Sequence, residues 1–245
     1  MAKKFKDYYD HEYLHLISGK ISSVYPRFDQ STFIAQTSPH LDGLEFHQRQ
    51  DLICQELAHH LPVDLSATLT IFTKMLGPEL VTDTGMFTHG WWLWPIGRYV
   101  QHHCLVQPEP SYEFIFELTK RFTGEFAIRP LIEFRTKEAL EIMVQWSLNP
   151  NVHVRRLSSE GIRTRLPWAN KQVAVLAYPE LVTTILTNLQ DAPEKFVQKS
   201  VGNVINDLYK DDPKLAQAIT SQWEQENPTK NTKWIINHGR RSLNK

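Results

Sequence analysis

Apolar residues recur at helical spacing along the second half of the chain, and strand-like alternation is scarce throughout. The segment 193–209 is the clearest case, because its apolar residues fall on one stripe: Val197, Val201, Val204, Ile205 and Leu208. The opposite face is polar and carries Lys199, Asn203, Asn206, Asp207 and Lys210. Asp191 and Glu194 predict a capping-box start, with Pro193 in the first turn. The pattern predicts an all-α protein.

A second amphipathic segment lies within residues 149–169. One face is apolar or small, with Val154, Leu157, Ser158 and Gly161, and the other is polar, with Arg156, Glu160, Arg163 and Thr164. Gly161 is expected to let a neighbouring helix approach closely. Pro167 disfavours the α conformation at Leu166, so we expect this helix to end there and Trp168 to follow just beyond its end.

These helices are expected to belong to a repeat. Superposing Val154-Arg155-Arg156 on Val197-Gln198-Lys199 gives an offset of 43 residues, and a third basic-flanked helix begins near Lys233. Partner helices are expected over 111–122, 125–135, 136–148 after a Thr136 cap, and 180–190. Helix pairs with a period of about 40 residues indicate a right-handed solenoid of HEAT type. Its second helices would form one concave surface bearing Arg156, Glu160, Lys199, Asn203, Asp207, Lys233 and Arg240.

The N-terminal third shows helical patches without an alignable repeat. We expect residues 1–80 to form a helical cap and residues 81–245 to form the repeats, all within a single domain 1–245. The aromatic run "GWWLWPIGRYV" is expected to pack in the core, because consecutive tryptophans are more often core than ligand platform.

The charge of the chain is balanced overall but uneven along its length. Lys+Arg and Asp+Glu both total 27. Residues 1–124 hold 10 basic and 14 acidic side chains, and residues 125–245 hold 17 and 13, so the second half is mildly basic. Two cysteines, Cys54 and Cys104, are too few for a disulfide framework. No secretory signal or long apolar run is present, which predicts a reducing cytoplasmic location.

The sequence offers no metal or cofactor motif. His102-His103-Cys104 and His59-His60 point in different directions on a helix and lack further ligands at suitable spacing. A Walker loop, a dinucleotide fingerprint and a GxSxG elbow are all missing, so we expect no metal and no cofactor.

The acids among the basic residues have simple alternative explanations. Glu160 would be a surface partner of Arg156 and Arg163, and Asp207 a solvated acid near Lys210. Glu125 would be a first-turn acid, and Trp168 would fill a gap between repeats. Spacing alone therefore indicates a helical-repeat binding module whose ligand stays open.

Three stretches go further: "FAIRPLIE", "NPNVHVRRLSSEGIRTRLPWA" and "VQKSVGNVINDLYKDDP". Together they resemble the AlkC branch of the AlkC/AlkD DNA glycosylases, most strongly over 125–215, and more weakly upstream through "GWWLWPIGRYVQHH". The resemblance implies a HEAT-like solenoid that holds duplex DNA in a concave cleft and excises small alkylated bases, 3-methyladenine above all, in base excision repair. Some members carry an additional immunoglobulin-like domain at the C-terminus, and because this sequence ends at "GRRSLNK" we expect it not to include one. We also expect a monomer.

The resemblance also implies roles for individual residues. Glu160 and Trp168 correspond to active-site positions, as do Glu125 and Asp207. Candidates for DNA phosphate contacts are Arg155, Arg156, Arg163, Arg165, Lys199 and Lys210. None of these active-site positions is a lysine that could serve as an amine nucleophile, so a monofunctional glycosylase is expected. A non-catalytic DNA-binding relative and a protein-binding solenoid are the alternatives.

Overall fold

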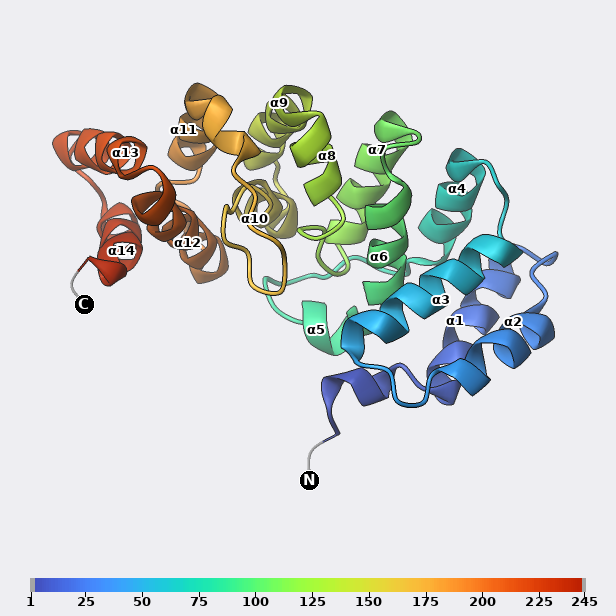
Figure 1. The fold of residues 1–245 in the computed structure, drawn as a ribbon. Coiled ribbons are helices and arrows are strands. Elements are labelled where there is room, and N and C mark those ends of the chain that lie inside the picture. The colour runs from blue at the N-terminus through green and yellow to red at the C-terminus, as the bar shows by residue number, and fades with distance from the viewer. Residues whose placement is uncertain (1–2, 244–245) are drawn as a thin grey trace. The chain divides into compact units, whose positions relative to one another are not determined.

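The computed structural model describes residues 3–243, which form helices and no β-strand (Figure 1). Its α-helices are α1 (His11–Val24), α2 (Gln30–Thr37), α3 (Phe46–His60), α4 (Leu65–Met75), α5 (Met86–His89), α6 (Trp94–His103), α7 (Pro108–Thr119), α8 (Arg129–Phe134), α9 (Thr136–Ser147), α10 (Val152–Glu160), α11 (Pro179–Asn188), α12 (Lys195–Asp211), α13 (Pro213–Gln225) and α14 (Lys230–Gly239). Short 3₁₀ helices are η1 (Phe5–Tyr8), η2 (Ser38–His40), η3 (Trp91–Leu93), η4 (Ala174–Ala177) and η5 (Arg240–Ser242). The predicted all-α class is confirmed. In the described range, every helix is too short or too polar to cross a membrane.

The chain divides into two compact units. The first comprises Met1–Leu80 and Gly85–Thr123, and the second comprises Val81–Thr84 and Gly124–Lys245. The division therefore falls near residue 123, well beyond the expected end of a cap at residue 80. That the two units form one domain stays a prediction.

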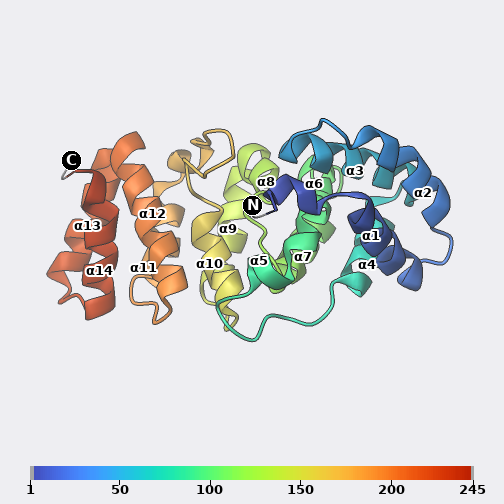
Figure 2. The same cartoon turned by 90° about the horizontal axis from the view of Figure 1, so that it is seen from below.

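The second unit is built from two rows of helices. Helices α8, α9, α11 and α13 form one row, and α10, α12 and α14 form the other, as Figure 1 shows. Figure 2 gives the view from below, in which the two rows overlap. In the second row α12 packs against α10 on one side and α14 on the other. The three helices of this row begin at Val152, Lys195 and Lys230, which confirms the predicted repeat of helix pairs.

Apolar stripes hold the second row together. All five predicted stripe residues of α12 are buried, and burial of each such side chain contributes about 1.5–3 kcal/mol. Glycine permits the closest helix approach: a Cβ on Gly239 would lie 2.4 Å from Ile205 Cγ2, where α14 meets α12. A Cβ on Gly161 would lie 2.5 Å from Met143 Cε, which confirms the close approach predicted there.

Helix α10 ends six residues earlier than Pro167 predicted. It ends at Glu160, and residues 161–173 form an irregular segment that we call the Trp168 loop. The loop closes on itself through a backbone hydrogen bond, since the backbone N–H of Gln172 donates to the Thr164 carbonyl. Arg163 and Thr164 are therefore loop residues and do not extend the polar face of the helix.

Three other predicted helix starts were also wrong. Glu194 is the N-cap of α12 but makes no capping hydrogen bond, because its carboxylate instead accepts from Arg155. Pro193 lies before the helix and not in its first turn. Helix α9 has Arg135 as its N-cap, so Thr136 is the first helical residue. Helix α8 begins at Arg129, which leaves Glu125 in the preceding turn. At Glu194 and Glu125 tertiary contacts override the local signals, since both carboxylates accept from arginines of α10.

The aromatic run belongs to the core of the first unit, as predicted. Leu93, Trp94 and Tyr99 are buried, and Trp91 and Trp92 are half-buried. The hydroxyls of Tyr9 and Tyr13 donate to the Trp91 and Trp92 carbonyls, each at 2.9 Å. These bonds give partners to the carbonyls of η3, the short 3₁₀ helix directly before α6.

Candidate active site

Five charged side chains form a continuous buried network in the second unit, which we call the carboxylate–arginine cluster: Glu125, Arg156, Glu160, Arg163 and Asp207. Arg156 Nη1 donates to Glu125 Oε2 at 2.7 Å, and its Nη2 lies 3.5 Å from Glu160 Oε1. Arg163 Nη1 donates to the same Glu160 oxygen at 2.9 Å, while Nε donates to Asp207 Oδ2 at 2.9 Å. The structure thus brings together all three acids that the sequence singled out.

The fold supplies the cluster from four places in the chain. Glu125 lies in the turn before α8, Arg156 and Glu160 lie one turn apart on α10, and Asp207 lies on α12. Arg163 reaches back from the Trp168 loop to bridge α10 and α12. Glu160 is only 5% exposed, so its interpretation as a surface partner is wrong, and the same holds for Asp207 as a solvated acid.

Two serines complete the surroundings of Glu160. Ser200 on α12 donates to Glu160 Oε2 at 2.6 Å, and Ser159 donates to the Ser200 hydroxyl at 2.7 Å. Glu160 is therefore bound by an arginine at one oxygen and a hydroxyl at the other. Charge-assisted bonds of this kind fix the orientation of the carboxylate.

The acids of the cluster differ in proton affinity. Burial and the charge of Glu160 raise the pKa of Glu125 above its usual value, against the opposing effect of Arg156. Burial acts in the same direction on Glu160, but Arg156, Arg163 and the Ser200 hydroxyl outweigh it and lower its pKa. Three carboxylates face two guanidiniums, so the fully ionised cluster has one excess negative charge.

Trp168 lies in the loop that follows this cluster. It is 68% exposed and has a left-handed backbone, with φ at 64°. The loop is tied to α12 by Asp211, whose carboxylate accepts from Arg165 at 2.7 Å and from Thr164 at 2.6 Å. The explanation of Trp168 as a gap filler between repeats does not fit such exposure.

The six candidate phosphate contacts fall into two groups. Arg156 and Arg163 are committed to the acids of the cluster, and Arg155 donates to Glu194 at 2.5 Å. Arg165 is exposed while bound to Asp211, and Lys199 and Lys210 are exposed on α12. The exposed members are the ones that a polyanion can reach in this conformation.

Arg240 was expected beside Asn203 and Asp207, and this is wrong. Helix α14 ends at Gly239, and Arg240 donates to Glu224 on α13 and to the Tyr209 hydroxyl near the end of α12. Arg241 takes the expected place, since it donates to Asn203 Oδ1 at 2.9 Å. The change from α14 to η5 rotates the two side chains.

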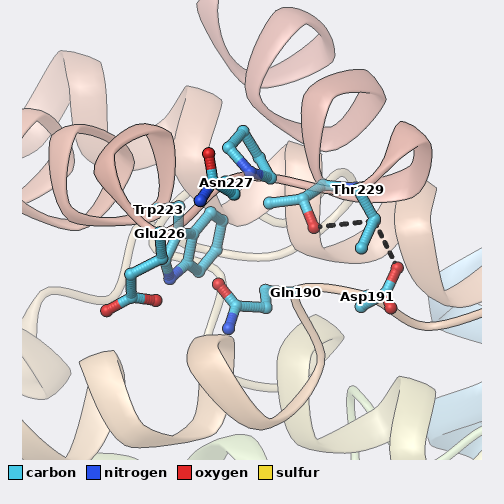
Figure 3. A pocket seen from close by; sticks show the side chains of 8 residues that line it. Gln190, Asp191, Trp223, Glu226, Asn227 and Thr229 are labelled. Carbon is cyan, nitrogen blue, oxygen red and sulfur yellow. Dashed lines mark hydrogen bonds between the residues drawn. The ribbon is translucent and has the colours of Figure 1, made fainter.

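A separate pocket of about 180 Å³ lies where α11 and α13 meet the start of α14, lined by Gln190, Asp191, Trp223, Asn227 and Thr229 among others (Figure 3). It shares no residue with the cluster. Asp191 accepts from the Thr229 hydroxyl at 2.5 Å, so its carboxylate serves the local structure. Within residues 3–243 no three His, Cys, Asp or Glu side chains are grouped to hold a metal ion.

The sequence reasoning missed Ser159, Ser200 and Arg129. Ser159 and Ser200 lie 41 residues apart in the sequence, and no local signal marks their contact across two helices. Arg129 stands in the motif "FAIRPLIE" and could have been found there, because a charged residue at the centre of an apolar motif is unusual unless it has buried partners.

The fold and the site define the class of protein: paired helices in two rows, with a charge cluster that joins α10 and α12 and an exposed tryptophan in the loop that follows α10. The structure is similar over its whole length to the Pseudomonas fluorescens alkylpurine DNA glycosylase AlkC bound to DNA containing an abasic site analog, with a TM-score of 0.86 and 32% identity. The chain belongs to the DNA alkylation repair enzyme family, whose model matches residues 114–243. The resemblance to the AlkC type is confirmed.

A curated relative matches over nearly the whole chain. The uncharacterized protein YhaZ of Bacillus subtilis (strain 168) is 32% identical over 239 residues, which is 97% of this chain. The chain spans 64% of the length of YhaZ and 66% of the AlkC chain in the solved structure.

Proposed function

We propose that this protein is a monofunctional alkylpurine DNA glycosylase that removes small cationic bases, above all 3-methyladenine, from duplex DNA. Family membership and the similarity to AlkC support this reaction class. The observation that carries the proposal is the buried carboxylate–arginine cluster with its excess of one negative charge.

The charge of the cluster suits the chemistry. An adenine that is methylated at N3 is already cationic in DNA and leaves as a neutral base, so no general acid is required. The reaction instead develops positive charge at the deoxyribose C1′, which a nearby carboxylate stabilises. Burial strengthens that interaction, and a carboxylate of Glu125, Glu160 or Asp207 would also orient the attacking water. The product would be an abasic site.

Trp168 would also stabilise the positive charge that the reaction develops. An exposed indole face can lie against the sugar or the cationic base, where it stabilises positive charge by about 0.5–2 kcal/mol. Selectivity would then come from the weakness of the cationic glycosidic bond, with the duplex bent toward the site. Arg165, Lys199 and Lys210 would hold the phosphates, and the protein would act as a monomer.

The proposal is tested by following bases released from methylated duplex DNA by chromatography. We expect wild type to release 3-methyladenine, and Glu160→Gln to lower the single-turnover rate by about a hundredfold or more while DNA binding is kept or improved. Glu125→Gln and Asp207→Asn alongside would rank the three acids. Borohydride trapping should yield no protein–DNA adduct, because a Schiff base is not formed.

Glu194→Gln is the matched control, since Glu194 is a half-buried acid paired with Arg155 outside the cluster. It should retain full activity, and thermal melts of all variants would exclude unfolding. DNA binding without base release would make the protein a non-catalytic relative. Absence of DNA binding would favour a protein-binding solenoid, which the balanced net charge also suits.

A further inference from the structure

Arg129 is a buried cation whose guanidinium donates to backbone carbonyls, and Glu133 acts on it only through longer-range attraction. Arg129 is 6% exposed, and no carboxylate in the described part of the chain lies within ion-pair distance of its guanidinium. Nη1 donates to the Arg163 carbonyl at 3.1 Å, and Nη2 donates to the Asn170 carbonyl at 2.7 Å. Both acceptors belong to the Trp168 loop, one on each side of the tryptophan.

A second side chain closes the same loop. The side-chain Nε2 of Gln172 donates to the Arg129 carbonyl at 2.8 Å, and the backbone N–H of Gln172 donates to the Thr164 carbonyl at 3.0 Å. The start and the end of the loop are thus joined to each other and to the start of α8. Trp168 stands between these fixed points.

The backbone at Trp168 needs such support. A left-handed conformation is unfavourable for a residue with a Cβ, and it persists only where surrounding contacts determine it. Removing a guanidinium from water is also unfavourable, and its burial lowers the pKa of Arg129. A planar fork with several donors can join two carbonyls from separate parts of a chain, which a lysine cannot do with the same geometry.

We propose that Arg129 is a positioning residue for the glycosylase reaction: it holds the Trp168 loop in the conformation that presents the indole to the DNA. The inference rests on the proposed function. Arg129 also binds the carbonyl of Arg163, whose guanidinium bridges Glu160 and Asp207. The hydrogen bond from Arg129 therefore fixes the loop at Arg163, the residue that joins the loop to the carboxylate–arginine cluster.

The first measurement is loop order in the free protein, because it does not depend on activity. Arg165 and Lys171 are exposed trypsin sites within the loop. We expect Arg129→Met to be cut at these sites at least about tenfold faster than wild type, since two charge-assisted hydrogen bonds no longer oppose local opening. Arg135→Met is the control, because Arg135 follows the same helix and forms an ion pair with Glu138 in which both side chains are more than a third exposed.

The second measurement separates positioning from structure. We expect Arg129→Met to lower the single-turnover rate by about a hundredfold while the Kd for duplex DNA changes little, because a small misplacement of a reacting group is costly. In a Trp168→Ala background the same change should have almost no further effect on the rate. Arg129→Lys keeps the charge and should still lose rate, and Gln172→Met should show a milder loss.

Unchanged proteolysis in Arg129→Met, or a rate loss that is fully additive with Trp168→Ala, would overturn the inference. If Arg129→Met does not fold, the same two criteria apply to Gln172→Met and Arg129→Lys. If wild type releases no base, the proposed function fails, while the proteolysis still decides whether Arg129 orders the loop.

Discussion

Glu160 shows how a residue that looks ordinary in sequence becomes unusual in the fold. Its spacing from Arg156 and Arg163 predicts weak surface pairs. The structure buries Glu160 and Arg163, leaves the Arg156 side chain only 11% exposed, and adds Ser200 and Asp207, which lie about 40 residues further along the chain. Sequence could single out the acid, because one carboxylate among four arginines is conspicuous. It could not predict the burial, which depends on contacts between α10 and α12.

A pH dependence belongs to the residue scale, because Glu125 has a raised pKa. As the pH falls from 7, Glu125 takes up a proton at a higher pH than an ordinary glutamate, whose pKa is about 4.3. Protonation removes the excess negative charge of the cluster. We therefore expect the base-excision rate to fall on the acid side, with a midpoint above the usual range.

Single-turnover rates between about pH 5 and 8 would check this, with spontaneous depurination subtracted. Glu125→Gln should excise bases more slowly at neutral pH, and it should lose the fall in rate at low pH, the acid limb, that Glu125 causes. Glu194→Gln should keep the limb of wild type. An acid limb that persists unchanged in Glu125→Gln would assign it to another group.

Glycine contacts between helices give a prediction at the scale of elements. A Cβ at Gly239 would meet the β-branched Ile205 at 2.4 and 2.8 Å, which cannot move aside without shifting α12 against α14. We expect Gly239→Ala to lower the free energy of unfolding by about 1–3 kcal/mol. Gly161→Ala should cost less, because its shortest contact is the flexible end of Met143.

Urea unfolding followed by circular dichroism would compare the two variants with wild type. Gly19→Ala on α1 is the control, since a Cβ there meets nothing within 4 Å. It should be neutral or slightly stabilising, because alanine has the higher helix propensity. Equal stability of Gly239→Ala and wild type would show that α14 can move without loss of packing.

The helices themselves were largely predictable, and their ends were not. The apolar stripe of α12 and the offset between α10 and α12 come directly from periodicity. The end of α10 at Glu160 has one local signal, the C-cap Gly161, but Pro167 offers a second possible end six residues later and the apolar pattern does not choose between them. The Trp168 loop takes its form from Arg129, Gln172 and Asp211, and two of these side chains bond the loop from more than 30 residues away. Such contacts appear only once the fold is known.

At the scale of the whole molecule, the basic second half has to be considered together with burial. Residues 125–245 have four more basic than acidic side chains, but Arg156 and Arg163 neutralise acids inside the unit. Phosphate binding would therefore depend on exposed cations such as Lys199 and Lys210 on α12. Catalysis and DNA affinity would then be carried by different charged residues.

Salt dependence of DNA binding tests that separation. Each lysine that neutralises a phosphate releases counterions, so Lys199→Ala and Lys210→Ala should each reduce the slope of log Kd against log salt by about 0.9. Both variants should bind duplex DNA more weakly whatever its sequence, and keep the wild-type excision rate at saturating protein. Lys137→Ala, an exposed lysine of α9 near Glu141 in the other row of helices, should leave the slope unchanged. If Lys137→Ala reduces the slope and the two α12 variants do not, the DNA lies on the opposite face of the second unit, and the carboxylate–arginine cluster cannot be the site of base excision.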